Sequence, residues 1–171
     1  MNFFELIKKR HSIRQYKKRE VQKDNIKKIL EAVKTAPSAG NVQAYHIFVV
    51  KQQANKDQLA LAAFGQNFIA QAGVVFVFMA DPSRSSSRYG SRGAELYATQ
   101  DATIACSYAQ LAARDLGLGA CWVGAFDEER VRLILKAPNE MLPVAILPVG
   151  YSAVPGSRCQ RRPLKDIFTD S

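Results

Sequence analysis

Apolar residues recur at helical spacing in three stretches of the chain. They predict a first helix that begins at Asn2, a second over residues 24–35 and a third over residues 95–116, with Gly117 as its C-terminal cap. A shorter helix is expected after Asp127, whose carboxylate is a good N-terminal cap. Because the third stretch is uncharged over much of its length, we expect that helix to be buried nearly all round.

β-Branched and aromatic residues predict strands over residues 46–51, 74–80, 120–125 and 143–150. The uncharged stretch 58–80 is long enough to suggest a membrane helix, but glutamines and glycines interrupt it, so we predict a buried helix followed by a buried strand. The chain lacks the Asn-Gly and Asp-Gly signals of tight hairpins, so helices or longer loops must join the strands. The pattern predicts one helix-rich mixed α/β domain over residues 1–171.

The third helix carries a seam of small residues, which lets another helix approach closely. The seam consists of Ala98, Ala102, Ala105, Ala109 and Ala112. We hypothesise that two copies of this helix meet in a dimer.

Residues 81–93 are rich in arginine and serine, and we predict a polar, mobile loop there. Contact of these arginines with RNA is an alternative, but a solvated loop is the better interpretation, and the role of the segment stays open.

The composition is that of a globular protein, with 47% hydrophobic and 23% charged residues. Its 24 Lys and Arg outnumber its 15 Asp and Glu, which gives a net charge of +9. The excess is +7 over residues 1–34, zero over residues 35–157 and +2 over residues 158–171. A surplus concentrated at the two ends favours a local anionic partner over a general contribution to solubility.

Cysteine and histidine usage excludes several kinds of site. The three cysteines are widely spaced and form no CxxC pair, which is typical of a reducing compartment and argues against a disulfide framework or a zinc site. The two histidines form no HExxH-type pair, so no metal is expected. The first ten residues lack the apolar region of a signal peptide. We expect a cytoplasmic protein with neither a membrane nor a nucleic acid as its partner.

The familiar catalytic and nucleotide-binding motifs are missing. Residues 117–122 read GLGACW, which begins like GxGxxG but has Trp122 in place of the third glycine and leads from a helix into a strand. The chain contains neither GxxxxGK[ST] nor GxSxG. An enzyme with so few acid, base or nucleophile signatures would depend on a cofactor for its chemistry.

Two basic segments are candidates for binding a phosphate. RHSIR, residues 10–14, offers two guanidinium groups and two shorter donors, which suit a phosphate monoester, although a solvated basic turn is the commoner structure. Arg158, Arg161 and Arg162 form either a second half of that site or a soluble tail.

Two further segments are candidates for contacting a flat ligand. The amides of Asn41 and Gln43 match the donor and acceptor groups at the edge of a heterocycle, but turn formation explains Asn41 equally well. The small residues Gly124 and Ala125 would let a flat ligand approach the backbone, or they simply end a strand before the capped helix.

Taken together, five motifs in order resemble the flavin-dependent nitroreductase family over nearly the whole chain. They are RHSIR, APSAGNVQAY, the alanine-rich helix running into GLGACWVGAFD, LPVGY and RRPLKDIF. The resemblance implies an α+β fold with a mixed, mainly antiparallel sheet flanked by helices, built as an intertwined homodimer with FMN in its interface.

The resemblance also assigns the site. Arg10, His11 and Ser12 would hold the FMN phosphate and ribityl chain, with Arg161 or Arg162 closing on the phosphate. Arg14 would stabilise negative charge on the pyrimidine side of the reduced ring. The ring edge would meet Pro37, Ser38, Asn41 and Gln43, the Pro-Ser part from the partner subunit, and the backbone of Val123, Gly124 and Ala125. No side chain would act as a catalytic acid or base, so Arg14, Gly124 and Ala125 only tune the flavin.

The implied activity is transfer of reducing equivalents from NADH or NADPH through FMN to a nitroaromatic, quinone or similar small-molecule acceptor by a ping-pong route. Reductive dehalogenation and peptide dehydrogenation use a similar scaffold. An FMN-binding protein without turnover and a non-catalytic basic module that binds polyanions are further alternatives. The chain has Ala44-Tyr45 where the family has Pro-Trp, and it is short for the family, so we expect an open pocket with broad acceptor tolerance.

Overall fold

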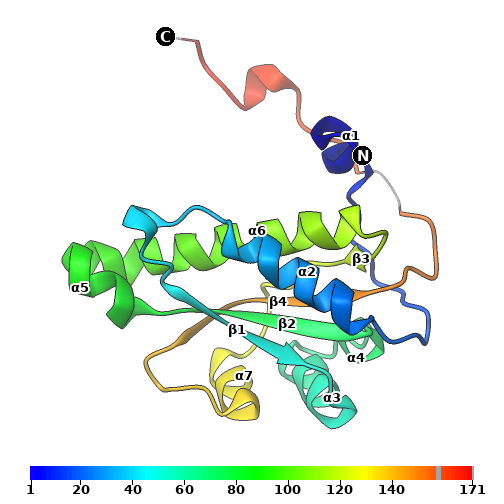
Figure 1. The fold of residues 1–171 in the computed structure, drawn as a ribbon, viewed down its shortest axis with the longest axis horizontal. Coiled ribbons are helices and arrows are strands. Elements are labelled where there is room, and N and C mark those ends of the chain that lie inside the picture. Colours follow the sequence, from blue (N-terminus) through cyan, green and yellow to red (C-terminus); the bar gives the residue numbers. More distant parts are fainter. Residues whose placement is uncertain (157–158, 171) are drawn as a thin grey trace.

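The computed structural model describes residues 1–156 and 159–170, and its main body consists of three layers (Figure 1). A four-stranded sheet lies in the middle, with α2 and α6 on one face and α3, α4 and α7 on the other. The strands are β1 (Tyr45–Val50), β2 (Val74–Ala80), β3 (Gly119–Ala120) and β4 (Leu142–Gly150). The α-helices are α1 (Phe3–Lys9), α2 (Lys23–Lys34), α3 (Gln53–Ala62), α4 (Phe68–Gln71), α5 (Pro82–Arg92), α6 (Ala98–Asp115) and α7 (Glu128–Leu135). Three short turns are η1 (Ala39–Asn41), η2 (Gly93–Tyr97) and η3 (Leu164–Asp166).

The sheet has the strand order β1-β2-β4-β3, and every strand pair is antiparallel. Strand β2 is fully buried because helices cover both of its faces. Val74, Phe76 and Phe78 pack in the layer of α2 and α6, and the alternate residues pack in the other layer. An isolated parallel bridge between Ser12 and Ala120 adds to the edge of β3. The expected mixed, mainly antiparallel sheet flanked by helices is confirmed.

The predicted helix starts are confirmed where a side chain caps the helix. Asn2 accepts a hydrogen bond from the N–H of Glu5 at 2.9 Å, and Asp127 accepts one from the N–H of Arg130 at 3.0 Å. The uncharged stretch before β2 contains two helices, α3 and α4, instead of one, because the chain turns at Phe64 and Gly65 with positive φ. Among the described residues, no helix has both the length and the apolar character needed to cross a membrane.

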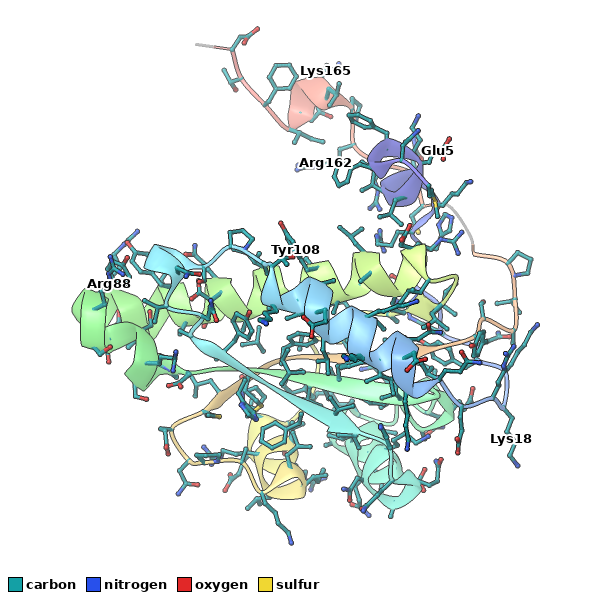
Figure 2. All side chains as sticks on the ribbon, in the orientation of Figure 1. Glu5, Lys18, Arg88, Tyr108, Arg162 and Lys165 are labelled. Carbon is teal, nitrogen blue, oxygen red and sulfur yellow. The ribbon has the colours of Figure 1, made fainter. Side chains whose placement is uncertain are left out.

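The alanine seam of α6 packs inside its own chain, so the seam is not available to a second copy, and contact between two copies of α6 stays a prediction for the outward face of the helix. Ala102, Ala105 and Ala109 are fully buried in the clusters that α6 forms with the sheet and with α2. The small side chains let α6 lie close to these neighbours. The outward stripe contains Ile104, Tyr108 and Leu111 instead, and Tyr108 is 37% exposed (Figure 2).

The prediction of a mobile loop over residues 81–93 is also wrong, because the structure has helix α5 there. The carboxylate of Asp81 caps the helix by accepting from the N–H of Arg84 at 2.9 Å, and Pro82 fits the first turn. The hydroxyls of Ser86 and Ser87 donate to carbonyls of their own helix at 3.0 and 2.8 Å. These local bonds let a serine-rich segment remain helical.

The strand predicted over residues 120–125 is reduced to β3 and an isolated bridge between Val123 and Ile146. The ladder between β3 and β4 breaks at Pro148. The carbonyl of Pro148 accepts a hydrogen bond from the N–H of Cys121 at 3.3 Å. Because proline has no N–H, Pro148 donates none in return. The regular ladder therefore stops at Ala120, although the backbone stays beside β4 as far as Val123, which exchanges two hydrogen bonds with Ile146.

Candidate functional site

The residues predicted to bind a phosphate follow α1 and lie along the open edge of β3. The N–H of Ile13 donates to the carbonyl of Ala120 at 3.0 Å, which fixes this segment to the sheet. Side chains of an extended segment alternate in direction, and here Ile13 is buried while Ser12 and Arg14 are exposed. Ser12 and Arg14 therefore lie on the same, exposed side of the segment, opposite Ile13.

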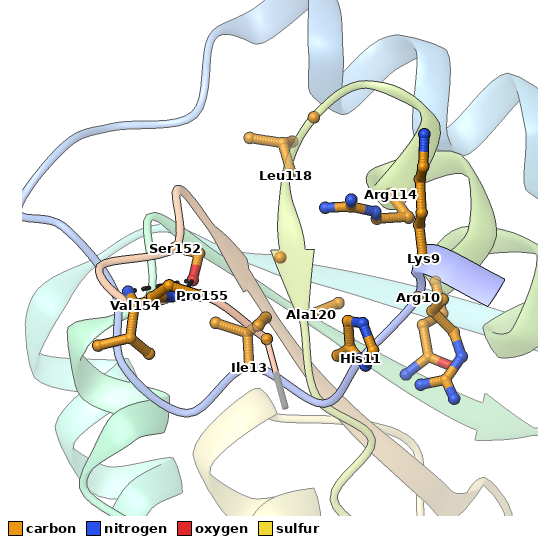
Figure 3. Close-up of a pocket in the computed structure, with 14 residues that line it drawn as sticks. Lys9, Arg10, His11, Ile13, Arg114, Leu118, Ala120, Ser152, Val154 and Pro155 are labelled. Atoms are coloured by element: carbon orange, nitrogen blue, oxygen red, sulfur yellow. Dashed lines mark hydrogen bonds between the residues drawn. The ribbon is translucent and has the colours of Figure 1, made fainter. Parts of the chain in front are cut away.

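A pocket of about 290 Å³ opens between this segment, the end of α6 and residues 152–156 (Figure 3). Lys9, Arg10 and Arg114 line it together with His11, and its lining, which belongs entirely to the described part of the chain, includes no carboxylate. Three cationic side chains without a counter-charge favour binding of an anion. A pocket this small suits the phosphate end of a larger ligand.

Arg114 also lines this pocket, although its residue type and position in the sequence did not mark it as a candidate. Its Nε is buried and has no hydrogen-bond partner among the described residues. A buried donor without an acceptor costs free energy, which an oxygen atom of a bound anion would recover. In the sequence, Arg114 stands in the last turn of a helix, where a cation is expected for helix stability alone. No local signal distinguishes the two roles.

The exposed side of residues 10–14 meets the start of α4. The guanidinium of Arg14 lies 6.0 Å from the ring centroid of Phe68. The carbonyl of Ala125 accepts a hydrogen bond from Nε2 of Gln66 at 3.2 Å. Arg14 contacts Phe68 and Ala125 contacts Gln66, two residues earlier in the chain. Arg14 and the segment that contains Gly124 therefore both lie at the start of α4. Gly124 and Ala125 are exposed and Val123 is buried, so the last two present accessible backbone.

A buried thiol lies beside these cations. Burial raises the pKa of Cys121, while the charge of Arg14, a hydrogen bond with Ser12 and the charge of Arg10 oppose that rise. The groups that oppose the rise are three of the five residues of the RHSIR segment, so these side chains lie close to the thiol.

The second predicted cluster, Pro37, Ser38, Asn41 and Gln43, lies at the other end of α6. Asp101, in the first turn of α6, accepts hydrogen bonds from the backbone of this loop, whereas residues 10–14 lie beyond the last turn of the same helix. An 18-residue helix is about 27 Å long. Within one chain, the structure does not bring the two clusters together.

The loop itself is tightly ordered by side-chain contacts. Ser38 Oγ accepts from the N–H of Gln43 at 3.0 Å, and Nε2 of Gln43 donates to Oδ1 of Asn41 at 3.0 Å. Both amide residues have positive φ, 58° for Asn41 and 53° for Gln43. This bond uses one hydrogen of the Gln43 amide and one lone pair of Asn41 Oδ1, and it leaves both amide hydrogens of Asn41 and the carbonyl oxygen of Gln43 free to contact a ligand.

Helix α5 gives the arginine-rich segment a structural role. Nε of Arg84 donates to the carbonyl of Val42 at 2.8 Å, and Nη1 of Arg88 donates to the carbonyl of Gly40 at 2.8 Å. Both arginines therefore hold the loop that carries Asn41. Composition alone could not show this role, because the partners are backbone atoms distant in sequence.

Among the described residues, the arginines of the basic tail make no hydrogen bond or ion pair with either cluster. Arg161 and Arg162 are exposed, and Figure 2 shows Arg162 beside α1, away from the sheet. Arg158 lies outside the described residues. Within residues 1–156 and 159–170, no group of three His, Cys, Asp or Glu side chains could hold a metal ion.

The fold and the site together define a three-layer α+β protein with a cationic pocket at the edge of its sheet. The model of the nitroreductase family matches residues 7–69 and 60–151. The chain therefore belongs to the nitroreductase family, a family of oxidoreductases, as its motifs predicted.

Individual relatives agree with this assignment. The chain is 33% identical to a protein of Thermus thermophilus named NADH dehydrogenase, over 93% of this chain and 91% of that protein. It is 31% identical to a Staphylococcus aureus NADPH-dependent oxidoreductase, over 96% of this chain and 71% of that protein. The structure of NfrA2 from B. megaterium superimposes with a TM-score of 0.91 at 27% identity, covering 99% of this chain and 74% of the other.

Proposed function

We propose that this protein is an FMN-dependent oxidoreductase that takes reducing equivalents from NADH or NADPH and passes them to nitroaromatic, quinone or similar acceptors in two alternating half-reactions. Membership of the nitroreductase family supports the flavin, and the names of the two relatives support a nicotinamide nucleotide as the donor. FMN, when bound, supplies the hydride chemistry that the side chains of this site lack.

The observation that carries this proposal is the cationic pocket with the unpartnered Nε of Arg114. Arg10 and Arg114 would bind the phosphate of FMN, and His11 and Ser12 would contact the phosphate and the ribityl chain. Guanidinium groups suit phosphate oxygens because their donors form planar pairs. Arg161 or Arg162 would complete the phosphate contacts from the basic tail.

The other residues would position the ring. Arg14 would stabilise negative charge on the pyrimidine side, since a fixed cation there favours the reduced ring. The backbone of Val123, Gly124 and Ala125 would face the hydride-accepting side, and the last two leave it accessible. The donor of Asn41 and the acceptor of Gln43 would bind the polar edge of the ring.

The site would be complete only in a homodimer. The two clusters lie at opposite ends of a helix about 27 Å long, so one chain cannot place both on one ring. A second copy would supply Pro37, Ser38, Asn41 and Gln43. Several large apolar side chains are exposed on α1 and on the tail, which extends past α1 away from the sheet (Figure 1). Exposed apolar surface of this kind is typical of an interface.

Purified protein tests the proposal directly. We expect a yellow protein that releases FMN on denaturation and is bleached by NADH or NADPH without oxygen. Arg10→Ala should lose FMN at least about tenfold more readily, because it removes a charged phosphate contact. Lys17→Ala, an exposed cation outside the pocket, is the matched control and should retain FMN. A colourless protein that cannot be reconstituted with FMN would falsify the proposal, and equal effects of the two substitutions would assign the binding to diffuse electrostatics.

A further inference from the structure

A second and larger cavity lies on the far side of α4 from Arg14. Its volume is about 810 Å³, and residues 16–26, the chain just after β1, the start of α3 and residues 70–73 enclose it. This volume falls within the range of pockets that bind whole small-molecule ligands. None of the residues assigned to FMN lines it.

The cavity has a basic rim. Five cations line it against one carboxylate, Glu20: they are Lys18, Arg19, Lys23, Lys51 and Lys56. Apolar side chains lie between them, among them Tyr16, Val21 and Ile26. Figure 2 shows Lys18 extending outward at this edge of the molecule. A basic rim around an apolar floor suits a ligand that has both an aromatic base and several phosphates.

Two of these cations are held in place by the fold. Nζ of Lys56 is buried and donates to the carbonyl of Ala72 at 2.8 Å, which leaves two of its three hydrogens for other acceptors. The guanidinium of Arg19 lies 4.0 Å from the ring centroid of Tyr151. Cations that are ordered before binding lose less entropy when a ligand arrives.

The cavity is next to the place where the flavin ring would lie. Helix α4 separates the two: Phe68 faces Arg14, while Ala70 and Gln71 line the cavity. The chain after Arg14 leads to Tyr16 in the lining within two residues. The cavity is therefore a candidate site for the other end of a dinucleotide whose nicotinamide contacts the ring.

We propose that this cavity binds the adenosine end of NADPH, with the 2′-phosphate and the pyrophosphate against its basic rim. The inference rests on the proposed function, since it places the donor of that reaction. Because NADPH carries one phosphate more than NADH, a rim of five cations favours NADPH. The structure thus assigns donor preference to residues outside the flavin site.

Binding of adenosine 2′,5′-bisphosphate, measured by calorimetry, tests the cavity independently of flavin reduction. We expect this compound to bind at least about tenfold more tightly than 5′-AMP, because it makes one more charge-assisted contact. Lys23→Glu/Lys51→Glu should remove that difference. Lys27→Glu/Lys28→Glu is the matched control, because it reverses two exposed charges of α2 that do not line the cavity. Equal binding of the two compounds by the unmodified protein, or equal losses in the two variants, would overturn the proposal.

Kinetics of the FMN-loaded protein supply the second readout. The Lys23→Glu/Lys51→Glu variant should raise KM for NADPH about tenfold with little change in KM for NADH or in kcat. Unchanged discrimination between the two donors in this variant would contradict the proposed cavity. If neither donor reduces the flavin, the proposed function fails, and the calorimetric comparison still decides whether the cavity binds the bisphosphate.

Discussion

The carboxylate of Asp101 in α6 is bound to the backbone of Ala44 before β1. One oxygen accepts from the N–H of Ala44 at 3.2 Å, and the other accepts from the N–H of Ala39 at 2.9 Å. Asp101 is only 1% exposed, so both bonds are shielded from water. This single side chain holds both ends of the loop that carries Asn41 and Gln43.

Asp101→Asn should lower the free energy of unfolding by about 2 kcal/mol, because the amide nitrogen would face a buried N–H and leave it without an acceptor. Urea denaturation measures the change. Gln100→Ala, on the exposed side of the same turn, should stay within about 0.5 kcal/mol of the unmodified protein. A stability loss no larger than that of the control would show that the carboxylate does not hold the loop.

Gly40→Ala should disturb the same loop by another route. Gly40 has φ of 53°, and a Cβ there would contact the hydroxyl of Tyr89 and lie 2.9 Å from Cζ of Arg88. Gly65→Ala is a matched control, since Gly65 also has positive φ but open space around it. We expect the free energy of unfolding of the control to fall by about 1–2 kcal/mol, because alanine is strained in a left-handed backbone conformation. The free energy of unfolding of Gly40→Ala, measured by urea denaturation, should fall by more than that of the control. Equal losses in the two variants would contradict crowding of the new Cβ by Tyr89 and Arg88.

The sequence predicted the parts of this structure that local chemistry determines. Periodicity predicted the buried strand β2, and the capping side chains Asn2 and Asp127 predicted the starts of two helices. The failures have non-local causes. Pro148, in the neighbouring strand, shortens β3, and the bonds of Arg84 and Arg88 to a distant loop give the arginine-rich segment its structural role.

The candidate site divides in the same way. The motif over residues 10–14 identified one cluster from local residue types, and the structure places that cluster beside the 123–125 segment. The sequence gives no sign of Arg114, because what marks this residue is a buried Nε without a hydrogen-bond partner among the described residues. That property depends on how α6 packs in the fold. The distance between the two clusters along α6 was likewise invisible in the sequence.

Arg114→Gln should weaken FMN binding at least about tenfold, since a charged contact with the phosphate would be lost. It should not lower the stability of the flavin-free protein, because Nε of Arg114 has no partner among the described residues. Fluorescence titration with FMN and urea denaturation separate these two effects. Arg130→Gln, on the exposed side of α7, is the control and should leave FMN binding unchanged. A loss of stability without a loss of FMN affinity would assign Arg114 to the fold.

Phe168→Glu should produce a monomer that does not retain FMN, if the exposed tail covers a second copy as proposed. A buried charge at an interface is costly, whereas the same charge in water is not. Leu133→Glu is the control, because Leu133 is equally prominent on α7, on the opposite side of the sheet from α6. Light scattering gives the mass, and the absorbance of the flavin gives its content. A dimeric Phe168→Glu variant with full FMN content would contradict the role of the tail.

Cys106 should make the stability of the protein depend on alkaline pH. Burial raises the pKa of this thiol well above its ordinary value of 9.0. Above pH 9.0 the unfolded state therefore releases a proton that the folded state keeps, so the free energy of unfolding falls as the pH rises. The contribution is fully present below that pH and is lost toward the folded pKa.

Cys106→Ala removes this thiol, so its free energy of unfolding should decline less steeply than that of the unmodified protein between pH 9 and pH 10.5. Cys159→Ser is the control, because Cys159 is exposed and should leave the slope unchanged. The remaining tyrosines and lysines titrate in all three proteins and cancel in the comparison. Urea denaturation at several pH values measures the slopes. Parallel slopes for Cys106→Ala and the unmodified protein would mean that the thiol ionises as readily in the folded core as in the unfolded chain.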